Sequence, residues 1–179
     1  VHSIDNHTIL IEIAERKPFG LWCGDTYIEK TSELSNCWFI DNTGFVFDHA
    51  PTFSENTYQE VYGTLEGVKN GSIVGSRLPE ARFNFIKEVK SAIEGDLGVC
   101  TRMSIKDNGE YGIIIQSSAL YPIITNSEVR FKDEQDARVI IKNLLEALPV
   151  QFPVDKALKK KLLYMDLRFD KKVFFGFEN

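Results

Sequence analysis

The sequence predicts an α+β fold: a mostly antiparallel sheet of many short strands with two main helices packed on it. Short runs with apolar side chains at alternate positions recur along the 179-residue chain, and brief turns join several of them. Two segments, near 78–95 and 133–148, instead show the apolar spacing of amphipathic helices. Because strands and helices do not alternate regularly, a βαβ repeat is not expected.

The shorter expected strands lie in the first part of the chain. Residues 8–14 are rich in β-branched side chains, and Pro18 ends this run because proline cannot donate to a strand ladder. Further strands are expected at 19–23 and 60–65. Residues 37–47 predict a hairpin in which Gly44 takes a positive φ. Residues 66–77, rich in Gly and Ser, predict a loop.

The two helices have recognisable ends. The first is expected to begin at Pro79 and to stop at Gly95 and Gly98. The second is expected to begin with Asp133 as N-cap and to end at Pro149. The buried stripes are Ala81, Phe85, Ile86, Val89 and Ile93 in the first, and Ala137, Ile140, Ile141, Leu144, Leu145 and Leu148 in the second.

The remaining segments predict strands. Residues 99–115 form a second hairpin around Asp107-Asn108-Gly109, and short strands are expected at 121–125 and 128–131. A closing pair follows at 162–169 and 173–177. Its first strand presents Leu163, Met165 and Leu167 on one face. Its second presents Val173, Phe175 and Phe177 on one face and Phe174 and Gly176 on the other. An exposed apolar edge promotes aggregation, so this last strand is either enclosed in the sheet or receives a partner.

Composition and cysteine content narrow the class of protein. The net charge of −5 argues against a nucleic-acid-binding surface, and no run reaches the length of a membrane span. Because the chain opens at Val1 and shows no signal peptide, an upstream targeting or anchoring segment is expected. Cys23 and Cys37 bracket a polar insertion and either form a disulfide or remain reduced, half-buried thiols. Cys100 is expected in the core. The sequence contains no CxxC motif and no His/Cys cluster, so a zinc site is not expected.

Motifs for catalysis are lacking. No nucleophile elbow, zincin helix, phosphate loop or dinucleotide fingerprint occurs, and the three histidines fall in expected loops or at the terminus. Asp166 and Asp170 flank Arg168, which favours a structural ion-pair network over a hydrolytic carboxylate pair. We therefore expect no catalytic residues, no cofactor and no metal, with an unrecognised hydrolase as a remote alternative.

Two separated stretches resemble the FtsQ/DivIB family of bacterial cell-division proteins. The first is residues 6–22, with its Glu15-Arg-Lys-Pro18 junction, followed by the Asp41…Gly44 turn and residues 45–47. The second is Tyr164-Met-Asp-Leu-Arg-Phe-Asp170, similar to the family's YVDLRYD strand and turn. The resemblance implies that residues 1–17 are the terminal strand of a truncated POTRA domain with its junction, and that residues 18–179 are the family's β domain.

The resemblance also implies a function. Members are single-pass, extracytoplasmic scaffolds of the division septum, without catalytic activity, and bind FtsB and FtsL by adding a partner strand near the C-terminus. The corresponding positions here are Phe169, Asp170, Lys171, Lys172, Val173, Phe174, Phe175, Gly176 and Phe177. Two departures stand out: the insertion between Cys23 and Cys37, and Lys171-Lys172 in place of a Gly-containing turn. The alternative is another extracytoplasmic adaptor, of a secretion or outer-membrane assembly type, whose last strand lies between two neighbours.

Overall fold

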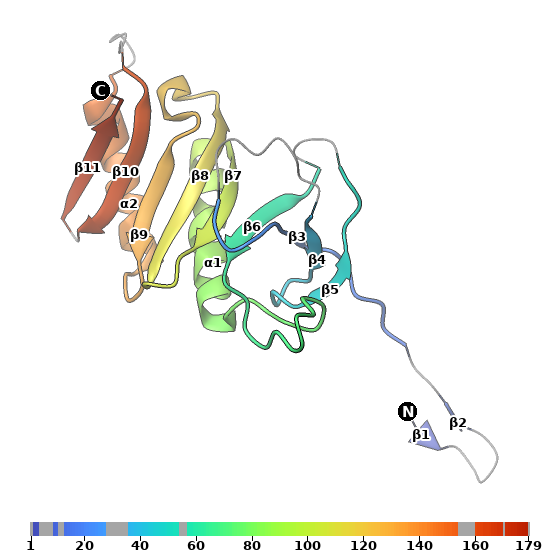
Figure 1. Cartoon of the computed structure of the whole chain (residues 1–179). Helices are drawn as coiled ribbons and strands as arrows, with labels where there is room; N and C mark the ends of the chain where they lie inside the picture. The colour runs from blue at the N-terminus through green and yellow to red at the C-terminus, as the bar shows by residue number, and fades with distance from the viewer. Residues whose placement is uncertain are drawn as a thin grey trace.

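The computed structural model describes residues 2–3, 9–10, 13–27, 36–53, 57–153, 160–169 and 171–178. Within them the α+β prediction is confirmed. One large, mostly antiparallel sheet has nine strands, and helices α1 (Glu80–Leu97) and α2 (Ala137–Gln151) pack on it. Figure 1 shows both helices on the same face, so no helix covers the other face of the sheet over β7 to β11. Over β6 that other face carries the ring of Tyr27, whose centroid lies 5.3 Å from that of Tyr62.

The strands of the large sheet do not follow their order in the chain. Adjacent pairs are antiparallel except for β10 with β9, β7 with β6 and β6 with β3, which are parallel. Across the sheet the order is β11 (Lys172–Phe177), β10 (Leu162–Phe169), β9 (Glu128–Lys132), β8 (Glu110–Ser118), β7 (Val99–Ile105), β6 (Gln59–Gly63), β3 (Gly20–Trp22), β4 (Trp38–Ile40) and β5 (Val46–His49).

The core lies between this sheet and the helices. One continuous row of facing residues runs from β3 to β11 on the helix side, and its central members are fully buried. Neighbours in the row are Trp22, Val61, Met103, Ile113, Val129, Met165 and Phe175. Phe175 ends the row because β11 is the last strand of the sheet.

The helices differ in detail from the prediction. In α2 the N-cap is Asp136, whose carboxylate accepts the N–H of Arg138 at 2.8 Å. Asp133 does not cap the helix, because the next residue, Glu134, has a positive φ of 69° and lies outside the helical conformation. Pro149 lies inside α2, whose last turn continues to Gln151. In α1 the buried stripe includes Phe83 and Leu97 rather than Ala81, and only Gly98 caps the end, in the left-handed conformation.

Three strand predictions are also corrected. Residues 121–125 contain a 3₁₀ turn, η1 (Pro122–Ile124), instead of a strand. Cys100 is exposed, because Val99 faces the helices and alternation turns Cys100 to the open face. In β10 an extra residue between Leu162 and Tyr164 shifts the register, so Leu162 is buried while Leu163 is 41% exposed.

The expected strand over residues 8–14 is only partly described. Ile9–Leu10 forms β2, which pairs with β1 (His2–Ser3) in a separate two-stranded sheet, and Ile13 and Ala14 belong to no strand. Residues 8, 11 and 12 lie outside the described residues. The assignment of residues 1–17 to a POTRA remnant stays a prediction.

Candidate functional site

The strand predicted to bind a partner is an outer edge of the sheet. β11 pairs with β10 and with no other described strand, so within the described part of the chain it does not lie between two neighbours, contrary to the alternative expectation. The opposite edge, β5, is partly covered. There the N–H of Val46 donates to the carbonyl of Ser76, and the N–H of Gly75 donates to that of Val46, each at 2.9 Å. β11 therefore offers the more open edge.

The direction of the peptide groups on β11 follows from one hydrogen bond. Glu178 donates its N–H to the carbonyl of Lys161 at 2.9 Å, toward the β10 side. In an antiparallel pair, the N–H and C=O of one residue point to the same side, and this side alternates along the strand. The extra residues at the two register shifts belong to β10, so the alternation of peptide groups along β11 is not interrupted. Val173, Phe175 and Phe177 therefore direct their N–H and C=O groups outward, away from the sheet.

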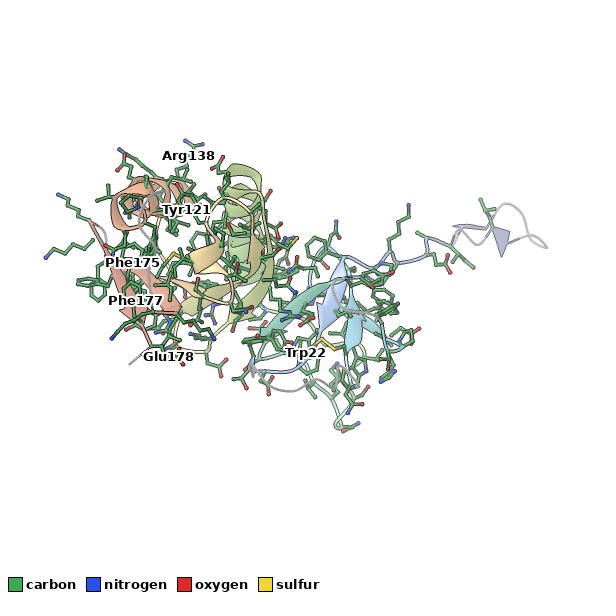
Figure 2. The ribbon with its side chains drawn as sticks, turned by 90° about the horizontal axis from the view of Figure 1, so that it is seen from above. Trp22, Tyr121, Arg138, Phe175, Phe177 and Glu178 are labelled. Atoms are coloured by element: carbon green, nitrogen blue, oxygen red, sulfur yellow. A yellow bond between two sulfur atoms is a disulfide. The ribbon has the colours of Figure 1, made fainter. Side chains whose placement is uncertain are left out.

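On the helix side, β11 is held by aromatic contacts. Phe152, which follows α2 and is buried, meets the rings of Phe175 and Phe177 edge-on, with centroid separations of 5.3 and 6.4 Å. Val173 packs on the same core. Figure 2 shows Phe175 and Phe177 at the end of the sheet opposite Trp22. Sequence reasoning missed Phe152, although its position just after the expected helix was a signal.

On the open face, the predicted site includes an exposed aromatic pair. Phe169 and Phe174 pack edge-on at 5.1 Å, and each is about half exposed, at 51% and 49%. Beside them Tyr164 lies over Gly176, and the guanidinium of Arg130 lies 4.0 Å from the centre of the Tyr164 ring. The open face near β11 thus combines apolar rings with a cation, and neither Tyr164 nor Arg130 was assigned to the site from the sequence.

Arg168 forms the expected ion-pair network, as far as it is described. Its guanidinium contacts the carboxylates of Asp166 and Glu110. The hydrogen bonds from Arg168 hold the pKa of Asp166 below its usual value. Asp170 lies outside the described residues, so its assignment to the site and to this network stays a prediction. Asp166 is engaged by a cation, which fits the structural interpretation.

Lys171 lies in the turn before β11, Lys172 is the first residue of the strand, and both are exposed. Neither forms an ion pair within the part of the chain that the structure describes. Two uncompensated positive charges therefore stand beside the outward peptide groups, on a chain whose net charge is −5.

The Cys23–Cys37 disulfide is confirmed at the far end of the sheet. β3 and β4 are antiparallel with Trp22 opposite Trp38, so the next facing positions are Cys23 and Cys37, whose Cα atoms lie 4.3 Å apart. The bridge joins the two strands where they leave the sheet. Residues 28–35 of the insertion lie outside the described residues.

The two motifs in the first resembling stretch meet in space. Arg16 of the Glu-Arg-Lys-Pro junction forms an ion pair with Asp41, which begins the turn to Gly44. Asp41 also accepts the N–H of Thr43 at 2.8 Å and of Phe45 at 3.1 Å. Burial would raise the pKa of Asp41, but the hydrogen bonds from the Thr43 hydroxyl, from these two N–H groups and from Arg16 outweigh it and lower the pKa. The junction is thus fastened to the β4–β5 turn.

Comparison with known proteins adds no relative. No protein-family model matches the chain, and no curated protein matches it significantly. Among the described residues, no group of three or more His, Cys, Asp and Glu side chains is arranged to hold a metal ion. The described helices include none with the length and apolar character needed to cross a membrane.

Proposed function

We propose that this chain is a non-catalytic scaffold domain of the bacterial divisome, of the FtsQ/DivIB type, which binds FtsB- and FtsL-like proteins by adding a partner strand to β11. The proposal depends above all on the position of β11, which among the described strands has a neighbour on one side only. The sequence resemblance in residues 6–22, 41–47 and 164–170 supplies the family and the class of partner.

Strand addition suits the chemistry of this edge. The outward N–H and C=O groups of Val173, Phe175 and Phe177 can continue the ladder, at a net gain of about 0.5–1.5 kcal/mol per hydrogen bond. Side chains of the incoming strand alternate between two faces. One face meets Phe175 and Phe177, and the other meets the exposed rings of Phe169 and Phe174. Aromatic residues at such an edge are typical hot spots of binding energy.

The two lysines favour an acidic partner. Lys171 and Lys172 lie at the start of β11 without an ion-pair partner among the described residues. Acidic residues on the partner strand would accelerate association and help to set its register.

An extracytoplasmic location at the septum is part of this proposal. The Cys23–Cys37 disulfide supports it, because such bonds persist in oxidising compartments outside the cytoplasm. A membrane-anchoring segment upstream of the chain is proposed on the resemblance alone.

The test is a binding measurement with extracytoplasmic segments of FtsB- and FtsL-like proteins. Val173→Pro removes an outward N–H and leaves the ladder to β10 intact, whereas Val173→Ala is the matched control that keeps the N–H. We expect Val173→Pro to weaken binding at least tenfold relative to Val173→Ala, which corresponds to about 1.4 kcal/mol.

Two further variants examine the side chains and the strand itself: Phe175→Asp, and a chain lacking residues 173–179. Circular dichroism and thermal melts first establish that each variant is folded. Unchanged binding by folded variants would show that the site lies elsewhere, and no binding by the parent chain would overturn the proposed partners.

A further inference from the structure

The edge strand β11 is complementary to itself. We infer that β11 pairs antiparallel with β11 of a second copy of this chain, about a two-fold axis at Phe175, and so joins the two sheets into one. The self-pairing depends only on the open edge. Its consequence, that a paired edge cannot accept a partner strand, rests on the proposed function.

The outward peptide groups select the register. Only residues that direct N–H and C=O outward can exchange hydrogen bonds across the new pair, namely Val173, Phe175 and Phe177. With Phe175 opposite Phe175 of the second copy, Val173 faces Phe177, and every outward group of β11 has a counterpart. A shift by two residues in either direction leaves Val173 or Phe177 facing a residue beyond the strand.

This register also matches the charges. It places Lys172 opposite Glu178 of the second copy, and the two-fold axis repeats this contact. Both residues are exposed, and neither forms an ion pair within the described residues. Figure 2 shows Glu178 at the same end of the sheet as Phe175 and Phe177. The chain thus supplies the acidic residue that Lys172 lacks within its own fold.

The side chains agree with the same pairing on both faces. On the helix side, Val173, Phe175 and Phe177 would meet their counterparts in the second copy. The buried row, which now ends with Met165 opposite Phe175, would thereby continue into the second sheet. On the open face, Phe174 would lie opposite Gly176 of the second copy, next to the Tyr164 ring that covers this glycine, so that the two aromatic rings would meet. Rings that are half exposed in one copy would be covered in the pair.

The contact is expected to be weak. A single added strand with its flanking side chains falls below the roughly 800 Å² per partner of a standard interface, so dissociation in the micromolar range or weaker is expected. Such an interface is displaced readily by a partner with more contacts, which makes self-pairing a means of keeping an apolar edge covered until that partner arrives.

A charge exchange tests the inference. Sedimentation equilibrium is measured on the 179-residue chain carrying Cys100→Ser, because exposed Cys100 could otherwise cross-link two copies. We expect Lys172→Glu and Glu178→Lys each to weaken self-association about tenfold, since each places like charges together twice. An equal mixture of these two variants should restore the parent affinity, because the mixed pair has both contacts attractive. Lys69→Glu, in the loop beside the opposite edge, is the matched control.

The outcomes separate this inference from the proposed function. A parent chain that stays monomeric at all concentrations overturns self-pairing, as does a dimer indifferent to Val173→Pro or to the charge exchange. Binding of FtsB- and FtsL-like segments is measured on dilute, monomeric protein, so that result stands or falls separately. If both hold, those segments should dissociate the dimer, and their joint binding to an intact dimer would refute mutual exclusion.

Discussion

The substitution Gly176→Ala tests how closely the side chain of Tyr164 packs on the edge strand. Gly176 is not among the residues with positive φ, so its backbone accepts alanine without strain. The obstacle is space, because a Cβ at this position would lie 2.3 Å from the Cε1 and Cζ atoms of Tyr164. The ring also contacts the guanidinium of Arg130 at 4.0 Å, so a displacement of the ring disturbs that contact.

The magnitude follows from two opposing terms. Overpacking costs about 1–3 kcal/mol, and because the Tyr164 ring is only partly buried we expect about 1–2 kcal/mol at this site. Against this, alanine in a strand is favoured over glycine by about 0.5–1 kcal/mol, because glycine loses more conformational entropy on folding. We expect Gly176→Ala to lower the free energy of unfolding by about 1 kcal/mol when Tyr164 is present.

The decisive comparison is a double-mutant cycle with Tyr164→Ala. Without the ring, Gly176→Ala should become neutral or stabilising by about 0.5 kcal/mol, so the substitution changes sign. Urea unfolding followed by circular dichroism measures all four proteins. Equal costs of Gly176→Ala with and without the Tyr164 ring would refute the steric explanation, and a stabilised single variant would show that the ring moves freely.

Three other predictions concern stability. Replacing both Cys23 and Cys37 by serine should lower the free energy of unfolding by about 3 kcal/mol, because the bridge closes a loop with a sequence separation of 14; an unchanged urea midpoint would contradict this. Phe83→Ala removes a fully buried ring and should cost about 3–5 kcal/mol in the same assay, whereas a cost below about 1 kcal/mol would mean that the core closes around the gap. Asp166→Asn should be less stable than the parent at neutral pH. Because Arg168 lowers the pKa of Asp166 in the folded state, the ionised carboxylate stabilises the fold above its unfolded pKa of about 4, and the difference should shrink as the pH falls below that value; a pH-independent difference would exclude this linkage.

Local patterns explain why the α+β class and most elements could be predicted. Alternating side chains mark strands, and helical spacing marks α1 and α2, because each reflects which face of a segment is buried. Turn chemistry placed Gly44 and Gly109, which both have φ of 79°, at the two hairpin turns. Two of the errors arose where one residue departs from a regular pattern: the extra residue after Leu162 in β10, and the early break at Glu134.

Part of the candidate site was likewise predicted from local patterns, and part of it was missed. Alternation along residues 173–177 correctly separated Phe174 from Phe175, since this follows from strand geometry alone. Phe152 was missed because it reaches β11 from a segment some twenty residues earlier in the chain. Arg130 was missed because its contact with Tyr164 depends on a parallel pairing of β9 with β10.

By itself the sequence determined the segments, their inward faces and an apolar last strand, because these properties depend on neighbours along the chain. Only the tertiary structure decided that β11 lies at an edge. Strand order depends on contacts between distant segments, including the parallel pairings of β10 with β9 and β7 with β6. The tertiary structure also showed that the opposite edge is partly closed by residues 75–76, whereas the peptide groups of Val173, Phe175 and Phe177 on β11 point away from the sheet.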